Sequence, residues 1–299
     1  MNGVLVVDKP KGPTSSDVVQ IVRRALKVKK AGHTGTLDPM ATGVLPLCLG
    51  DATRIAQVLT DGNKAYDATL KLGVTTDTLD AEGAVLQTRA VPTLTRERLE
   101  QVFATFRGAL MQTPPMYSAK KVGGKKLYDL ARQGVTVERK AANVTVSKLE
   151  IISPLRPSGD DSGTWDLGLA VRCSAGTYIR TLAEDIGRKL GVGAHLRELR
   201  RTAAGKFTIS QAITIEELAD MPEPADALVS MNLAISHLPA FTVREDRVAK
   251  TMNGMSTRVF ETGLADREVV RMITEAGGLL AIGFFDAAEN VIQPKAVLV

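Results

Sequence analysis

One acidic side chain, Asp38, stands alone in a long stretch of sequence that carries no other Asp, Glu, Lys or Arg. The stretch, residues 32–50, reads GHTGTLDPMATGVLPLCLG, with four glycines, two prolines and no amphipathic period. Its glycines would let a planar substrate approach the backbone, and His33 and Thr34 add polar groups without a competing charge. Taken alone, an Asp before Pro is best explained as a turn residue. Its setting makes Asp38 a candidate nucleophile in a predicted loop.

A carboxylate nucleophile in a dry site has to stay ionised, which requires a fixed cation beside it. Arg180 in the segment CSAGTYIR is the candidate cation, because it lies just inside the start of a predicted helix. All four tyrosines lie in turn-rich, basic parts of the chain; they are Tyr66, Tyr117, Tyr128 and Tyr178. A tyrosine beside Lys or Arg can stack on a base while the cation holds a phosphate. A core position with a satisfied hydroxyl is the alternative for each of them.

The sequence lacks the motifs that indicate metal binding, phosphate or dinucleotide binding, or a serine nucleophile. Cys48 and Cys173 lie far apart, and the three histidines, His33, His195 and His237, are scattered singly. This spacing predicts reduced thiols and no metal site. No Lys-Ser/Thr follows GHTGTLD as in a phosphate-binding loop, and neither a GxGxxG nor a GxSxG motif is present. We therefore expect chemistry without a metal or a cofactor.

Predicted helices and strands interleave around these residues. Helices are expected over residues 16–27 (capped by Ser16), 52–59, 95–106, 127–134 and 177–191, and strands over 3–7, 65–73, 144–152 and 164–173. Turns or loops are expected over residues 75–83 and 112–126. Since the elements show no strict βαβ repeat, they predict an α/β (α+β) fold with a mixed central sheet and surrounding helices.

A shift in composition divides the chain. Residues 221–241 are acidic and contain proline, and short β-like runs with glycine turns follow them. This pattern predicts one domain over residues 1–237 and a small C-terminal β-barrel over residues 238–299. No apolar run of membrane-spanning length and no signal peptide is readable, so we expect no membrane association and a cytoplasmic location.

The basic surplus of the 299-residue chain is confined to its first two thirds. The formal net charge is +5, and residues 1–205 contain 30 Lys and Arg against 20 Asp and Glu. The counts are 1 against 5 over residues 206–238 and 7 against 8 over residues 239–299. Such a surplus suits a polyanionic partner, because each neutralised phosphate releases counterions. A solvated basic surface without a partner explains the charge alone equally well.

Five long blocks, spread over residues 4–202, share one resemblance. They are LVVDKPKGPTSSDVV, GHTGTLDPMATGVLPLCLGDATR, YDATLKLGVTTDTLDAEG, QTPPMYSAKKVGGKKLYDLARQG and RCSAGTYIRTLAEDIG, with GVGAHLRELRRT behind the last. In this order they resemble the TruB-type tRNA pseudouridine-55 synthases. The C-terminal segment is similar, by pattern alone, to a PUA-type RNA-binding barrel. The resemblance implies a pseudouridine-synthase catalytic domain followed by a PUA-like domain, acting on the tRNA T-loop as a monomer without a cofactor.

The resemblance also implies a mechanism. Asp38 would be the nucleophile that attacks a uridine of the T-loop. The glycosidic carbon–nitrogen bond then breaks, and the uracil rotates while held and rejoins the ribose through its carbon-5. Arg180 would pair with Asp38, and Tyr66 would lie against the flipped base and move a proton from the ribose.

Further residues would surround the flipped nucleotide. By the same resemblance, His33 would fill the space that the base leaves, while Tyr178 and Leu199 would line the uracil pocket. A flipped base that is briefly detached needs a tight, dry pocket. Apolar residues near Asp38 are candidates for its wall, with plain core positions as the alternative; they are Leu37, Met40, Val44 and Leu45.

Three basic segments and one further lysine become candidate contacts to the RNA backbone. The candidates are Lys9, Arg23, Arg24, Lys27, Lys29, Lys30, Lys120, Lys121, Lys125, Lys126, Arg197, Arg200 and Arg201. Each of them taken alone is more often part of a solvated face. The sequence departs from the family at Ala175, where some relatives carry Lys, and at Arg54, where Lys is common.

Two other functions fit parts of the sequence. An RNA-binding protein or RNA chaperone without catalysis would use the same basic and tyrosine clusters. A guide-dependent relative that modifies ribosomal RNA would normally bring larger extensions than this chain has. Asp38 separates catalysis from binding alone, because only an enzyme needs its carboxylate.

Overall fold

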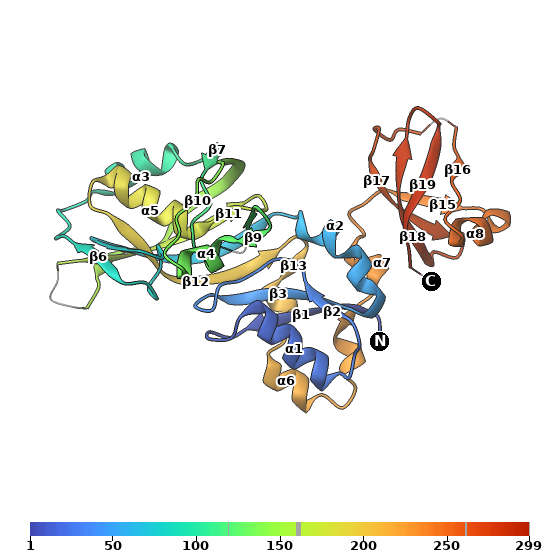
Figure 1. The fold of residues 1–299 in the computed structure, drawn as a ribbon, viewed down its shortest axis with the longest axis horizontal. Coiled ribbons are helices and arrows are strands. Elements are labelled where there is room, and N and C mark those ends of the chain that lie inside the picture. Colours follow the sequence, from blue (N-terminus) through green and yellow to red (C-terminus); the bar gives the residue numbers. More distant parts are fainter. Residues whose placement is uncertain (119, 160–162, 261, 299) are drawn as a thin grey trace.

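A computed structural model of the protein describes residues 1–118, 120–159, 163–260 and 262–298, without the side chains of Lys121 and Lys126 (Figure 1). Its main feature is a ten-stranded sheet. Eight strands follow one another in space as β14 (Leu228–Val229), β1 (Gly3–Lys9), β3 (Thr42–Leu49), β12 (Ala194–Ala204), β4 (Lys64–Leu72), β11 (Trp165–Cys173), β10 (Ala142–Pro157) and β7 (Gly108–Gln112). In addition, β2 (Ala31–His33) pairs with β3, and β13 (Phe207–Thr208) pairs with β12.

One parallel contact joins two antiparallel halves of this sheet. Strands β14, β1 and β3 are antiparallel, as are β12, β4, β11, β10 and β7. Strand β3 meets β12 in parallel, with Thr42 opposite Arg200 and Gly43 opposite Arg201. Gly43 has φ +101°, and a Cβ atom at this position would lie 2.2 Å from the carbonyl oxygen of Arg201. The two halves therefore meet through a glycine, five residues after Asp38.

Helices cover the faces of both halves. They are α1 (Ser15–Ala25), α2 (Ala56–Thr60), α3 (Arg96–Ala104), α4 (Leu127–Arg132), α5 (Ile179–Leu190), α6 (Ile215–Asp220) and α7 (Met231–Ala234), with 3-10 turns η1 (Gly50–Ile55), η2 (Ile209–Gln211) and η3 (Pro224–Ala227). Helix α8 (Glu245–Met252) instead packs against strands of the C-terminal part. In Figure 1, α3 and α5 lie over the half that contains β10 and β11, and α1 and α6 lie beside β1 and β3. Phe103, Leu149 and Ile186 are fully buried in the core between helices and sheet. The expected mixed sheet with surrounding helices is confirmed.

Two small hairpins complete this part of the chain. They are β5 (Val74–Thr76) with β6 (Val85–Thr88), and β8 (Lys121–Val122) with β9 (Lys125–Lys126). The second hairpin lies within residues 112–126, which the sequence predicts as a loop. Among the described residues, no helix is both long and apolar enough to cross a membrane.

Several sequence-based predictions about this part are wrong in detail. Of residues 32–50, only 34–41 form a loop, because the segments on either side pair in the sheet as β2 and β3. Strand β3 is buried on both faces, so its sequence lacks the alternation of apolar and polar residues that marks a half-buried strand. No element is expected over residues 192–205, yet β12 lies there, with a register shift between Leu196 and Glu198 that breaks its period. Helix α1 begins earlier than expected, and Thr14 caps it instead of Ser16, in a reciprocal capping box with Asp17.

The C-terminal part forms a second sheet of five strands. Their order is β15 (Ala240–Val243), β17 (Val269–Thr274), β18 (Leu279–Asp286), β19 (Val291–Val297) and β16 (Thr257–Arg258). Within residues 240–260 and 262–298 the pairing runs as an open path from β15 to β16. Ile282 and Leu298 from this part share a buried cluster with Val4 and Ile55, and Arg54 donates a hydrogen bond to the carbonyl oxygen of Val297.

We expect Gly43→Ala to lower the free energy of unfolding by about 3 kcal/mol, since it adds both a positive-φ penalty and a steric clash at the β3–β12 contact. Gly12→Ala is the matched control, because Gly12 has φ +112° but no atom lies within 4 Å of the place that an added methyl group would take. The control should lose only about 1–2 kcal/mol. Urea denaturation measures both losses, and equal values would contradict the close approach at Gly43.

Candidate active site

A fully buried lysine holds the loop that carries Asp38. Lys9, at the end of β1, donates hydrogen bonds from Nζ to the carbonyl oxygens of Pro10 (2.9 Å), Pro39 (3.3 Å) and Ala41 (2.7 Å). All three protons of the ammonium group are therefore used by backbone carbonyl oxygens, two of them in the segment that directly follows Asp38. The prediction that Lys9 contacts the RNA backbone is wrong, because its side chain is buried and fully hydrogen-bonded.

Two more buried side chains fix the start of the same loop. Ser15, the first residue of α1, donates from Oγ to the carbonyl oxygen of Leu37 (2.9 Å) and accepts from its N–H (2.8 Å). Arg201, on β12, donates to the carbonyl oxygens of Gly35 (3.0 Å) and Val44 (2.6 Å). Only 1% of Arg201 is exposed, so its interpretation as part of a phosphate-binding face is also wrong.

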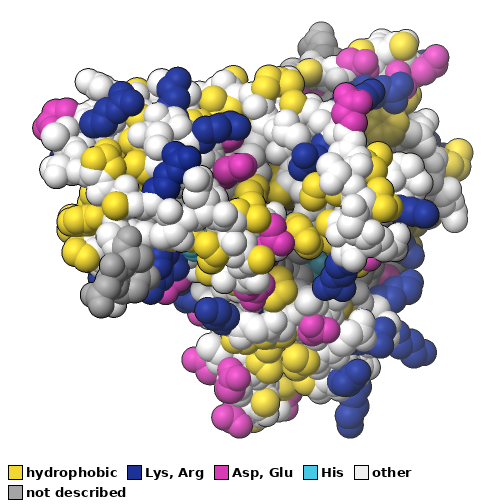
Figure 2. Space-filling model, turned by 60° about the vertical axis from the view of Figure 1, so that its left-hand side comes forward, with side chains coloured by type: hydrophobic (Ala, Val, Ile, Leu, Met, Phe, Trp, Pro, Cys, Tyr) yellow, Lys and Arg dark blue, Asp and Glu magenta, His cyan; other side chains and the backbone are white. Residues whose placement is uncertain are grey.

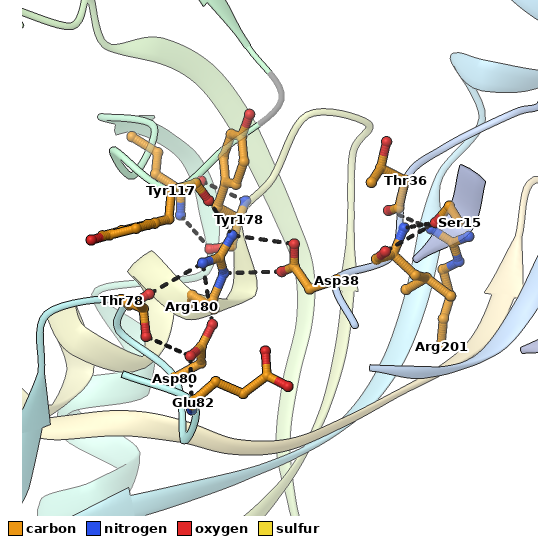
Figure 3. A network of polar contacts seen from close by, with 12 residues as sticks. Ser15, Thr36, Asp38, Thr78, Asp80, Glu82, Tyr117, Tyr178, Arg180 and Arg201 are labelled. Carbon is orange, nitrogen blue, oxygen red and sulfur yellow. Dashed lines mark hydrogen bonds and ion pairs between the residues drawn. The ribbon is translucent and has the colours of Figure 1, made fainter. Parts of the chain in front are cut away.

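Arg180 connects Asp38 to the other half of the sheet (Figure 3). Its Nε lies 3.0 Å from Oδ2 of Asp38, and its Nη2 donates to Oδ1 of the same carboxylate at 3.3 Å. Its Nη1 donates to Asp80 Oδ2 and to the carbonyl oxygen of Thr78, both at 3.2 Å, and its Nη2 also donates to the carbonyl oxygen of Tyr117 at 2.6 Å. The expected pairing of Arg180 with Asp38 is thus present as a two-point contact.

The Asp38 carboxylate is the accessible member of this network. About 36% of its side chain is exposed, against 6% for Arg180 and 5% for Asp80. Burial raises the pKa of Asp38 above its ordinary value, and the Arg180 guanidinium opposes this rise. Asp80 raises the pKa of Asp38 further, and Lys9 lowers it. Arg180 is therefore the main group that favours the ionised form of Asp38.

Asp80 is a member of the network that the sequence does not reveal. It lies in the expected turn over residues 75–83, and its Oδ1 accepts hydrogen bonds from Thr78 Oγ1 (2.5 Å) and from the N–H of Glu82 (3.1 Å). Gly83 makes this turn possible, because a Cβ atom there would lie 2.3 Å from Thr78 Oγ1. Acidic residues are common in turns, and the link from Asp80 to Arg180 crosses a hundred positions that no local pattern spans.

A cavity of about 250 Å³ opens beside Asp38, and its lining brings together five of the predicted site residues. Besides Asp38 and Arg180, these are Tyr66 on β4, Tyr178 before α5, and Leu199 on β12. Burial raises the pKa of Tyr66, whose hydroxyl interacts with the buried Arg201 guanidinium. The cavity therefore combines a reachable carboxylate with a buried phenol and with both polar and apolar lining residues.

Other predicted pocket residues lie elsewhere. His33 is half-buried on β2, where its Nδ1 accepts a weak hydrogen bond from the N–H of Gly35 (3.4 Å), and it is not among the lining residues. Of the predicted apolar wall, Leu37 lines the cavity, whereas Met40 lines a separate hollow. The last two wall candidates are core residues of β3; they are Val44 and Leu45.

The backbone of Tyr178 is held by a side-chain amide. Gln112, the last residue of β7, accepts from the N–H of Tyr178 at Oε1 (2.7 Å) and donates from Nε2 to its carbonyl oxygen (3.1 Å). Only 6% of Gln112 is exposed. Sequence reasoning missed this residue, because it treats the segment QTPPMYSAKK as a loop without side-chain roles.

The remaining basic candidates differ in their environment. Arg200 pairs with both carboxylate oxygens of Asp8 (3.1 and 2.6 Å), and Arg197 pairs with Asp166 (2.6 Å). Arg23, Lys29, Lys30 and Lys120 are exposed, and the side chain of Lys121 lies outside the described residues. Figure 2 shows Lys and Arg side chains over one face of the molecule, several of them projecting at one edge. In the described part of the chain, no group of three or more His, Cys, Asp or Glu side chains is placed to hold a metal ion.

Two family models match consecutive parts of the chain. The TruB family pseudouridylate synthase N-terminal domain matches residues 23–179, more than half of the sequence, and the tRNA pseudouridylate synthase B C-terminal domain matches residues 180–231. The chain belongs to the TruB family. The residues of the Asp38–Arg180–Asp80 network all fall within these two matches or at their border.

Relatives match this TruB-family chain over nearly all of its length. Proteins named tRNA pseudouridine synthase B are 44% identical in Heliobacterium modesticaldum (95% of this chain, 90% of the relative) and 38% identical in Bacillus pumilus (100% and 98%). A solved structure of a Cbf5–Nop10–Gar1 complex contains a similar chain, with a TM-score of 0.77 and 28% identity over 99% of this chain and 85% of that one. The expected α+β pseudouridine-synthase fold is confirmed.

We expect Lys9→Met to change how stability depends on pH. Burial lowers the pKa of Lys9 from 10.5 to about 8. Between these two values the unfolded chain binds the proton more tightly than the folded protein, so the contribution of Lys9 to stability rises with pH in this window. The free energy of unfolding, measured in urea from pH 7 to 10.5, should therefore rise less steeply in Lys9→Met than in the wild type. Lys11→Met, at an exposed lysine, should keep the wild-type slope, and identical slopes in all three proteins would refute the assignment.

Proposed function

We propose that this chain isomerises uridine-55 in the T-loop of tRNA to pseudouridine, with Asp38 as the nucleophile. One observation carries the proposal: the accessible Asp38 carboxylate makes a two-point contact with the buried Arg180, at the edge of a cavity that also holds Tyr66, Tyr178 and Leu199. Membership of the TruB family supports it, as do relatives 38–46% identical that are named tRNA pseudouridine synthase B.

The size of the cavity suits one extruded base. Pockets for drug-sized ligands have volumes of about 300–1,000 Å³, and the 250 Å³ beside Asp38 lies just below this range. A uridine inside a folded T-loop has to leave its stack to enter such a space, at a cost of a few kcal/mol that contacts in the pocket and along the backbone offset. Tyr66 then lies against the flipped base, and Tyr178 and Leu199 keep it from water.

The reaction divides into steps that these residues serve. Asp38, ionised beside Arg180, attacks ribose C1′, and the bond between C1′ and uracil N1 breaks with its electron pair left on the uracil. The held ring rotates and C5 bonds to C1′ as the Asp38 carboxylate leaves, after which C5 loses its proton and N1 gains one. Tyr66 is the candidate for moving a proton from the ribose and returning it, since the product keeps every ribose hydrogen. Substrate and product contain the same atoms, so the reaction is an isomerisation that consumes no co-substrate.

The C-terminal sheet belongs to the proposal as a PUA-like RNA-binding domain over residues 238–299, after a catalytic domain over residues 1–237. Strand β15 begins at Ala240, next to the proposed boundary, and the structural match to the Cbf5 chain extends over this part. We propose that the protein acts in the cytoplasm and as a monomer.

A guide-dependent activity is the second candidate, because similar chains occur in solved complexes with Nop10 and Gar1 and in an H/ACA RNP bound to a substrate RNA. The higher identity to relatives named tRNA pseudouridine synthase B, at 44% against 28%, favours action on tRNA. Incubation of the purified protein alone with a tRNA transcript separates the two, since a guide-dependent enzyme makes no product without its partners.

Asp38→Asn tests the nucleophile. We expect this variant to fold and to bind tRNA, yet to form no pseudouridine, because a neutral amide cannot replace the carboxylate in attack. Mass mapping of pseudouridine in a tRNA transcript is the measurement. Asp67→Asn, at an exposed acid beside Tyr66 on β4, is the control and should keep its activity. Product formed by Asp38→Asn would refute the role of Asp38.

Lys29→Gln with Lys30→Gln tests the basic segment after α1. Each phosphate contact that is lost should reduce the slope of log affinity against log salt by about one, so the double variant should lose about two. The control is the double variant Lys148→Gln with Lys189→Gln, which removes the same amount of charge elsewhere on the surface. Both lysines are exposed, and Lys189 lies at the opposite end of α5 from Arg180. If both double variants keep the wild-type slope, Lys29 and Lys30 belong to a solvated surface.

A further inference from the structure

The hydroxyl of Ser118 is buried beside the candidate site without a hydrogen-bond partner. Only 5% of the residue is exposed, and its Oγ contacts no donor or acceptor in the described structure. Ser118 lines the same cavity as Asp38, Tyr66 and Tyr178. Among the described residues of that lining, it alone has a fully buried side-chain polar atom that lacks a partner. An unpaired buried hydroxyl costs free energy, and a ligand bound in this cavity would supply the missing partner.

The backbone around Ser118 is fixed by the site itself. Its N–H donates to the carbonyl oxygen of Met116 (3.0 Å), and its carbonyl oxygen accepts from the N–H of Tyr128 (3.1 Å). The preceding carbonyl, that of Tyr117, accepts from Arg180 Nη2. The guanidinium that pairs with Asp38 thus also positions the residue next to Ser118.

The proposed reaction creates a need for such a donor. When the bond from C1′ to N1 breaks, the uracil keeps the electron pair, and its negative charge spreads from N1 onto the carbonyl oxygens O2 and O4. A donor that is fixed in a dry pocket stabilises such developing charge far better than one in water. Arg180 is not free for this task, because its three nitrogens already face Asp38, Asp80 and two carbonyl oxygens.

We propose that Ser118 Oγ donates a hydrogen bond to a carbonyl oxygen of the uracil and stabilises the charge that appears when the glycosidic bond breaks. The proposal rests on the proposed function. It makes Ser118 a catalytic residue that contacts the base, in a segment that sequence reasoning treats only as a basic loop.

Single-turnover kinetics on a tRNA transcript, with enzyme in excess, test the proposal. Ser118→Ala should lower the rate constant of pseudouridine formation about 10- to 100-fold and leave tRNA affinity unchanged. Its melting temperature should stay the same or rise, because the variant removes an unpaired buried hydroxyl. Thr181→Val is the matched control: Thr181 Oγ1 is also buried and unpartnered and follows Arg180 directly, but Thr181 does not line the cavity. The control should keep the wild-type rate.

A transcript with 5-fluorouridine at the target position adds a readout that a structural role does not affect. Fluorine already stabilises the negative ring, so consumption of this substrate should be slowed less by Ser118→Ala than consumption of uridine. A Ser118→Ala rate within twofold of the wild type, an equal loss on both substrates, or a loss confined to tRNA affinity would overturn the proposal. If the wild type itself forms no pseudouridine, the proposed function fails as well.

Discussion

The site depends on one buried guanidinium that has to be neutralised. Taking Arg180 out of water is costly unless anions and carbonyl oxygens surround it. The loop before β3 supplies Asp38, the turn after β5 supplies Asp80, and the segment after β7 supplies the carbonyl oxygen of Tyr117. These segments are distant in sequence and come from both halves of the sheet. The need to pair a single cation thus assembles three walls of the cavity around Asp38.

The carboxylates of Asp38 and Asp80 have different roles because their environments differ. Asp80 is almost fully enclosed and accepts hydrogen bonds from its own turn, so it serves as a fixed counterion. Asp38 is more exposed and receives its support from one side only, through Arg180. The backbone on its other side is tied down by Lys9, Ser15 and Arg201. A rigid loop thereby presents a carboxylate with one face open to a substrate.

The sequence alone predicts the elements whose patterns are local. Helices α1, α3 and α5 follow from amphipathic periods, and Asp38 and Arg180 follow from their types and settings together with the family resemblance. Burial is not local, and it explains the errors. Lys9 and Arg201 look like surface cations by residue type, yet the backbone of the Asp38 loop uses their donors. Strand β3 lacks alternation because both of its faces are covered, and the part played by Asp80 depends on a contact with a distant helix.

The buried cluster that Ile282 and Leu298 share with Val4 and Ile55 has a consequence for the whole molecule. A swing of the C-terminal sheet away from β1 and η1 would expose these apolar side chains to water, which is unfavourable in proportion to the area exposed. The shared cluster therefore restrains the C-terminal sheet against movement relative to β1 and η1. For a ligand that contacts both the C-terminal sheet and the cavity, the distance between its two contact points decides whether its reactive position reaches Asp38.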